Sequence, residues 1–206
     1  GLGDVYKRQG YMESDEAIVT WCVGHLVTMS YPEAYDEKWK RWTIEPLPFI
    51  PKEFKYEVID GVKKQFQIVS GILNRPDVDI IYVCTDSGRE GEYIYRLVEM
   101  QAHVTGKERR RVWIDSQTEE EILRGIKEAK ELSAYDNLCD AAYLRAKEDY
   151  LMGINFSRVL TLMQVPQTVS EFILNNFHSP VAILLIINVF LLIVGMVMDT
   201  TPAILI

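Results

Sequence analysis

Residues 80–92 read IIYVCTDSGREGE and hold the strand-to-helix turn around which the rest of the sequence is organised. The apolar, β-branched start predicts a buried strand, and the Ser-Gly pair predicts a turn before a helix. The stretch gathers Asp86, Glu90 and Glu92 at the carboxyl end of that strand, where α/β folds place their sites. Carboxylates crowded in this way favour a hard divalent cation such as Mg²⁺. The alternative is a solvated turn whose acidic residues are stabilised by the helix dipole.

Helical and extended patterns alternate on both sides of this turn. Thr118 and Glu121 have the spacing of a capping box ahead of a helix. Residues 31–53, rich in proline and aromatic residues, instead predict an ordered loop. The other expected elements are strands at 18–23, 78–85 and 111–114 and helices at 62–73, 90–102 and 136–153. This alternation predicts an α/β fold with a mostly parallel sheet flanked by helices.

Charge divides the chain into two unlike parts. All 22 Lys and Arg residues precede residue 164, and only Glu171 and Asp199 of the 30 acidic residues follow it, within a formal net charge of −8. The acidic first part argues against nucleic-acid binding by bulk charge. Its one obvious basic cluster, residues 107–111 (KERRR), is interpreted as a solvated loop, with a local nucleic-acid contact as the alternative. The three cysteines form no CxxC pair, which favours a reducing compartment.

The tail carries a long apolar segment. Residues 181–198 contain no charged side chain and a single amide, Asn188. About 20 apolar residues span the hydrocarbon core of a bilayer, so this segment predicts a C-terminal transmembrane-like helix in contact with a membrane. A buried helix of a soluble domain is the alternative.

Several motifs together resemble one family. The acidic stretch at 86–92 resembles the strand-turn-helix of Toprim domains, the metal-binding fold of type IA DNA topoisomerases and of some primases and nucleases. Further segments resemble the topoisomerase III branch of that family, so that the likeness covers roughly residues 17–162: WCVGHL at 21–26, PEAY at 32–35, residues 42–51, RVWI at 111–114 and GINFSR at 153–158.

The resemblance implies a Mg²⁺ site held by Asp86, Glu90 and Glu92. The family usually has a second aspartate two positions after the first, where this chain has Gly88. That departure implies one carboxylate ligand fewer.

The resemblance also implies single-stranded DNA as the partner, with Arg89 and Arg145 in contact with it. A salt bridge between Arg89 and its acidic neighbours is the alternative for the first arginine. A helix-surface pair with Asp149 is the alternative for Arg145. His25 is expected to be a structural histidine.

Two parts of the family's machinery are not found in this sequence. The family's fold opens with a strand that carries a glutamate, and its nucleophilic tyrosine lies further along than any residue here. We therefore expect that this chain alone neither cleaves nor relaxes DNA. The topoisomerase-like part is expected to be cytoplasmic.

The tail resembles a different family. Residues 165–167 and 186–202 resemble the large permease subunit of TRAP dicarboxylate transporters, and residues 1–9 are similar to translated sequencing-adaptor leaders. The sequence thus predicts a non-native, unstructured leader at 1–10, a Toprim domain and the start of the following region at 11–162, and a hydrophobic membrane-type segment at 163–206. We interpret the chain as an artificial join near residues 162–165. The alternatives are a membrane-anchored topoisomerase, a stand-alone Toprim nuclease or primase, and a transport component.

Overall fold

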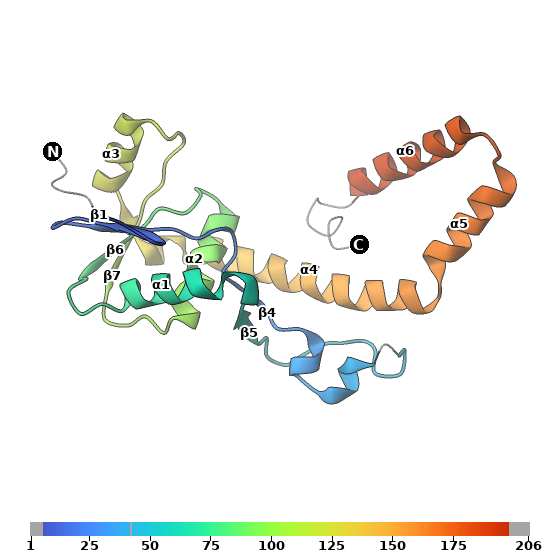
Figure 1. Ribbon diagram of the computed structural model, residues 1–206, viewed down its shortest axis with the longest axis horizontal. Helices are drawn as coiled ribbons and strands as arrows, with labels where there is room; N and C mark the ends of the chain where they lie inside the picture. Colours follow the sequence, from blue (N-terminus) through green and yellow to red (C-terminus); the bar gives the residue numbers. More distant parts are fainter. Residues whose placement is uncertain (1–5, 42, 198–206) are drawn as a thin grey trace. The chain divides into compact units, whose positions relative to one another are not determined.

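The structure is a computed structural model that describes residues 6–41 and 43–197. It divides the chain into two compact units, one formed by Gly1–Ser30 with Phe54–Leu144 and the other by Tyr31–Glu53 with Arg145–Ile206. The first unit contains the acidic turn (Figure 1).

Unit 1 is mixed α/β, with three small sheets among the residues that the structure describes. β1 (Tyr6–Arg8), β2 (Tyr11–Glu13) and β3 (Ile18–Thr20) form an antiparallel sheet in that order. β4 (Val27–Met29) and β5 (Tyr56–Val58) form an antiparallel pair. In the third sheet β6 (Ile80–Val83) pairs in parallel with β7 (Glu108–Arg111), which pairs antiparallel with β8 (Lys130–Glu131).

The mixed α/β class is therefore confirmed, but the expectation of a mostly parallel sheet is wrong. Within the described residues only β6 and β7 pair in parallel, because only this pair is joined by a crossover helix. Residues 6–8, for which the sequence predicted no regular structure, form β1. Arg8 pairs with Tyr11 across a two-residue turn in which Gly10 has φ +86°, and such tight hairpin turns require a positive φ.

The helices of unit 1 follow the apolar periodicity closely. α1 (Lys63–Leu73) and α2 (Arg89–Gln101) lie within a residue of the predicted ranges, and α3 (Glu119–Lys127) begins after Thr118. The Thr118 side chain makes no cap hydrogen bond, so the predicted capping box is not formed. α2 contacts α1, β4 and β5, and its buried Leu97 and Val98 belong to the core of the unit.

Unit 2 is organised around one aromatic side chain from the proline-rich loop. Phe49 is 2% exposed and packs edge-to-face against Tyr35, Trp39 and Tyr150. The main chain of Phe49 is held by Asn155, whose Oδ1 accepts from its N–H at 2.6 Å and whose Nδ2 donates to its carbonyl at 2.9 Å. The prediction of an ordered loop at residues 31–53 is thus confirmed. The short 3₁₀ helices η1 (Pro32–Ala34) and η2 (Glu37–Lys40) lie within it.

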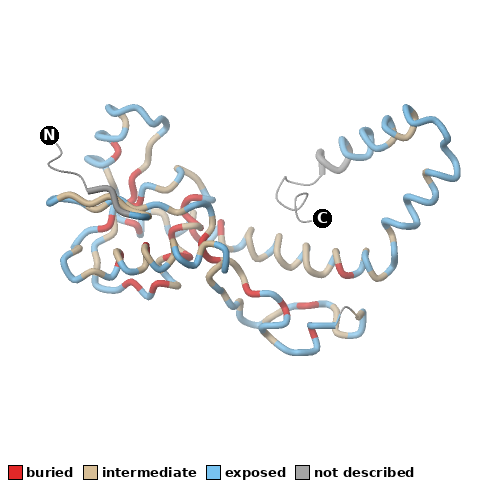
Figure 2. The backbone as a smooth tube through the Cα atoms, in the orientation of Figure 1, coloured by how far each residue is buried: buried red, intermediate tan, exposed pale blue. Residues whose placement is uncertain are grey.

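Three helices follow in the part of the chain that the structure describes. α4 (Asp136–Leu162) is longer than predicted and contributes its first residues to unit 1, and Gln164, with φ +53°, separates it from α5 (Val165–Asn176). α6 (Pro180–Val197) follows. The residues of α5 and α6 whose burial is described are all exposed or half-buried (Figure 2).

The prediction of a transmembrane helix at residues 181–198 is not supported. Within residues 6–41 and 43–197, no helix has the combination of length and apolar character that a membrane span requires. Met198 lies outside the described residues.

Candidate functional site

The acidic turn runs from the end of β6 to the start of α2. The Gly88 N–H donates to the Asp86 carbonyl at 2.9 Å, and the Ser87 hydroxyl accepts from the Ile114 N–H at 2.9 Å. The Thr85 hydroxyl donates to the Gly91 carbonyl at 2.7 Å, which ties the end of the strand to the first turn of the helix. The main chain of the turn is therefore fixed on both sides, while the Asp86 side chain is left exposed.

Gly91 lets the helix approach the turn closely. A Cβ atom built on Gly91 would lie 2.6 Å from the Asp86 nitrogen and 2.8 Å from its carbonyl carbon, and nearer still to the carbonyl oxygen. Real Cβ atoms essentially never come this close to main-chain atoms. The glycine is thus required by the close contact between α2 and the turn.

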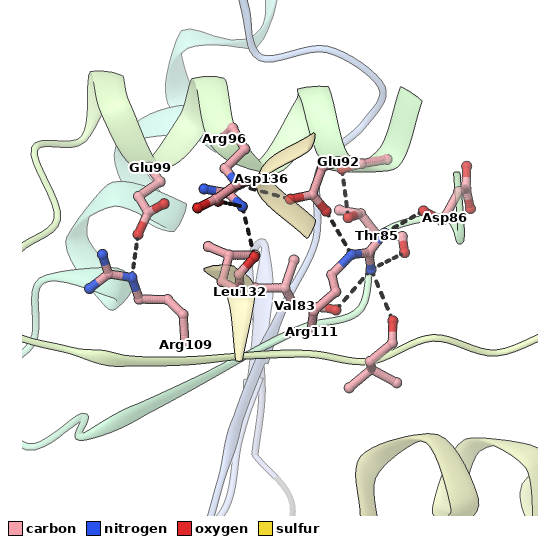
Figure 3. A network of polar contacts seen from close by, with 12 residues as sticks. Val83, Thr85, Asp86, Glu92, Arg96, Glu99, Arg109, Arg111, Leu132 and Asp136 are labelled. Atoms are coloured by element: carbon pink, nitrogen blue, oxygen red, sulfur yellow. Dashed lines mark hydrogen bonds and ion pairs between the residues drawn. The ribbon is translucent and has the colours of Figure 1, made fainter. Parts of the chain in front are cut away.

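Glu92 and Arg111 form a buried ion pair beneath the turn (Figure 3). Both side chains are 0% exposed, and the Arg111 Nε donates to Glu92 Oε2 at 2.9 Å. The Arg111 guanidinium also donates to the carbonyl oxygens of Val83, Thr85, Asp86 and Val112 at 2.6–3.0 Å. Such dense hydrogen bonding is what allows a charge to be buried at this depth.

A second arginine extends this pair toward α4. Arg96 Nε donates to Glu92 Oε1 at 2.8 Å, and its Nη2 donates to the Leu132 carbonyl and to Asp136 Oδ1 at 2.9 and 2.8 Å. Although burial opposes its charge, the hydrogen bonds to Glu92 and Asp136 hold the pKa of Arg96 above its ordinary value. Both carboxylate oxygens of Glu92 are thus bonded to guanidinium groups.

The structure therefore separates the three predicted metal ligands. Asp86 and Glu90 are exposed, the latter with 70% of its side chain accessible, whereas Glu92 points into the protein toward Arg111 and Arg96. Across residues 6–41 and 43–197, no three His, Cys, Asp or Glu side chains gather closely enough to hold a metal ion. A three-carboxylate Mg²⁺ site does not fit this arrangement. A site with two carboxylates does fit the donor chemistry, because Mg²⁺ commonly uses one or two carboxylates and keeps several waters.

His25 reaches the same region from the segment before β4. Its Nε2 contacts Glu90 Oε1, and its ring packs edge-to-face on Tyr93 at a centroid distance of 6.0 Å. Tyr93 in turn packs on Tyr143 at 5.0 Å, and burial raises the pKa of both phenols. The aromatic packing agrees with the structural role predicted for His25, but its contact with a candidate ligand was not foreseen.

The two arginines predicted to contact DNA lie in different units. Arg89, the first residue of α2, is exposed and forms no ion pair within the described part of the chain. Arg145 lies in unit 2, and its Nε is 3.6 Å from Asp149 Oδ2, as the helix-surface alternative predicted. Of the two arginines, Arg89 belongs to the unit that contains the acidic turn.

Arg111 is the site residue that sequence reasoning missed. The cluster at 107–111 was interpreted as a solvated loop and the strand was expected at 111–114, but β7 is Glu108–Arg111. Arg109 and Arg111 point to the same side of this strand, and they pair with Glu99 and Glu92, which lie two turns apart on one face of α2. Arginines at alternate positions of a strand and glutamates seven residues apart on a helix were the sequence signal for these two ion pairs.

Comparison with known proteins finds two different families in this chain. It is 43% identical over 160 residues to DNA topoisomerase 3 of Shouchella clausii, a match that covers 78% of this chain and 22% of the relative. The corresponding protein of Bacillus licheniformis is 44% identical over 155 residues, and that of Bacillus subtilis 43%, each covering 75% of this chain and 21% of the relative. The chain spans about a fifth of the length of these relatives.

A family model for the DctM component of the tripartite ATP-independent periplasmic transporter matches residues 153–206. This agrees with the resemblance of the tail to a TRAP permease subunit. Some three quarters of this chain is therefore homologous to bacterial DNA topoisomerase 3, and the C-terminal residues match the DctM component of a tripartite transporter.

Proposed function

We propose that unit 1 serves as the acidic, DNA-facing lobe of a type IA DNA topoisomerase and that this chain does not carry out the complete strand-passage reaction. The observation that carries the proposal is the identity of 43% over 160 residues to DNA topoisomerase 3, within a chain that spans only 22% of that relative. The exposed Asp86 and Glu90 at the head of α2 supply the chemistry expected of such a lobe.

Asp86 and Glu90 would hold the Mg²⁺ ion through carboxylate oxygens, with waters or a DNA phosphate as the other ligands. The bound ion would neutralise phosphate charge at the DNA backbone. Glu92 is assigned instead to the ion pair with Arg111 and Arg96, because both of its oxygens are already bonded.

Arg89 would bind a phosphate of single-stranded DNA beside this ion. It is exposed at the N-terminal end of α2, where main-chain N–H groups and the helix dipole also favour an anion. Arg145 is the second candidate contact, and its pair with Asp149 at 3.6 Å is the interaction that a phosphate would compete with.

The test is the binding of a fluorescent oligothymidylate to the full chain, followed by anisotropy over a range of salt, with Mg²⁺ or with EDTA. We expect Mg²⁺ to strengthen binding in the wild type and not in Asp86→Asn, with Asp140→Asn on the exposed side of α4 as the control. Arg89→Gln should lower the salt dependence by about 0.7 per lost phosphate contact, whereas Arg124→Gln on α3 should not change it. Equal binding by all variants, or relaxation of plasmid DNA by the chain alone, would refute the proposal.

The match at residues 153–206 supports a second proposal about the tail. We infer that these residues derive from a transporter of the DctM type and that two unrelated coding sequences meet near the break between α4 and α5. A single long sequencing read of the source DNA across codons 160–168 tests this. A continuous natural gene in independent samples would argue for a genuine fusion instead.

A further inference from the structure

We propose that Arg111 and Glu92 act as a positioning pair that sets where Asp86 lies relative to Glu90. The inference rests on the proposed function in one respect only, that Asp86 and Glu90 are the metal-binding groups. Neither Arg111 nor Glu92 would touch the ion or the DNA.

Arg111 holds the strand side of the site. All of its described hydrogen bonds except the one to Glu92 go to main-chain carbonyls (Figure 3). Those carbonyls belong to Val83 at 3.0 Å, Thr85 at 2.7 Å, Asp86 at 2.6 Å and Val112 at 3.0 Å. One guanidinium thus fixes the end of β6 and the turn up to Asp86. A lysine has a single compact donor group and cannot span these acceptors.

Glu92 holds the helix side of the site. It lies two residues after Glu90 in the first turn of α2, and its carboxylate is clamped between Arg111 at 2.9 Å and Arg96 at 2.8 Å. Arg96 extends the clamp to Asp136 and the Leu132 carbonyl. The head of α2 therefore cannot shift along its axis without breaking charged hydrogen bonds in a fully buried place.

Asp86 lies at the end of the strand segment and Glu90 at the start of α2, and the buried Arg111–Glu92 pair joins these two segments. The close contact of Gly91 with the Asp86 main chain leaves no slack between those segments. Loss of the pair should consequently change the placement of the two exposed carboxylates before it changes the rest of the fold.

A matched control is available on the same two elements. Arg109 of β7 pairs with Glu99 of α2 at 2.7 Å, but it donates to no carbonyl of the acidic turn. Arg109 and Glu99 are 32% and 13% exposed, so this pair is also partly buried. If the ion pairs only fasten the helix to the strand, the two pairs should behave alike.

The experiment compares Arg111→Lys and Glu92→Gln with Arg109→Lys and Glu99→Gln in the full chain. Amide hydrogen exchange is followed at Gly88, which donates to the Asp86 carbonyl, and at Val69 in the core of α1. Mn²⁺ binding is followed by paramagnetic broadening of the Asp86 signals. Both measurements are made on each variant at a temperature below its own melting temperature, where it is folded.

We expect exchange at Gly88 to rise about ten-fold or more in Arg111→Lys, beyond any change at Val69, and Mn²⁺ affinity to fall by a similar factor. The Arg109 and Glu99 variants should remain within about three-fold of wild type in both measurements. If Gly88 and Val69 change in parallel, or if the control variants match Arg111→Lys, the pair is merely structural and the proposal is overturned.

Three further results keep the test decisive. If the wild type fails to bind Mn²⁺, the proposed metal site is wrong, and the exchange at Gly88 still decides whether Arg111 positions the turn. If Arg111→Lys does not fold, Glu92→Gln, which keeps the side-chain shape, replaces it. Rapid exchange of Gly88 in the wild type itself would also overturn the proposal, because a positioned turn must be protected.

Discussion

The substitution Gly91→Ala tests the tight contact between α2 and the acidic turn most directly. The new methyl group would lie 2.6 Å from the Asp86 nitrogen and 2.8 Å from its carbonyl carbon, where ordinary contact begins at 3.4 Å. The obstructing atoms are main chain and cannot rotate away as a side chain could. Either the turn or the first turn of the helix must move by more than half an ångström.

Two opposing effects set the size of the change. Replacing glycine with alanine in a helix stabilises it by up to about 1 kcal/mol. Overpacking typically costs about 1–3 kcal/mol, and we expect the upper part of that range because Asp86 also accepts hydrogen bonds from Gly88 and Arg111. The net expectation is a destabilisation of about 2 kcal/mol.

Gly71 provides the control for this substitution. It lies in α1, and a Cβ atom built on it meets nothing within 4 Å, so Gly71→Ala should stabilise the protein by about 0.5–1 kcal/mol. Urea denaturation of both variants, monitored by circular dichroism, gives the two free energies of unfolding. The comparison requires that the variants share the wild-type m value, the slope of the free energy against urea concentration. If Gly91→Ala is as stable as the wild type, or shifts in the same direction as Gly71→Ala, the close contact described here is wrong.

Three further predictions concern charge, hydrogen bonding and pH. Arg111→Met leaves Glu92 Oε2 without its donor in a fully buried place, although Arg96 still bonds Oε1, and should lower the free energy of unfolding by roughly 3 kcal/mol in urea; a loss under 1 kcal/mol would contradict the buried pair. Asn155→Ala removes both hydrogen bonds to the Phe49 main chain and should cost about 1–3 kcal/mol in thermal unfolding, with Asn176→Ala, an exposed amide on α5, as a neutral control. Hydrogen bonds from Arg75 lower the pKa of Asp77 to about 2, so the stabilisation that this carboxylate provides is present above its ordinary pKa and is lost as the pH falls toward 2. A carboxyl titration by NMR should show the low pKa in the wild type and a return to the ordinary range in Arg75→Gln.

The sequence predicted the helices better than the sheet. α1 and α2 carry apolar side chains such as Val69 and Leu97 at helical spacing, and this periodicity is a local property that survives in the folded chain. The pairing of strands is decided by residues far apart in sequence. β7 therefore appeared at Glu108–Arg111, where local preference indicated a loop, because its main chain completes the ladder of β6.

The transmembrane-like helix was predicted from composition, and composition does not decide what an apolar helix packs against. α6 forms as a helix over Pro180–Val197, as the run of apolar residues predicts. Side chains such as Leu184 and Phe190 are about 60% exposed in the structure. The local sequence pattern determines that α6 is a helix, whereas the burial of its side chains depends on packing partners that this pattern does not identify.

The placement of Glu92 follows from helix geometry applied to the acidic stretch. Three carboxylates in seven residues suggest one cluster when the sequence is read as a line, but Glu90 and Glu92 both lie in the first turn of α2. Residues that are two positions apart on a helix are separated by about 200° around its axis, so the Glu90 and Glu92 side chains must point to nearly opposite sides. Once Glu90 is exposed beside Asp86, Glu92 has to face the sheet, and a buried carboxylate needs a cationic partner. Arg111 supplies it, which is why this one arginine of β7 is fully buried and why the exposed part of the acidic turn contains two carboxylates instead of three.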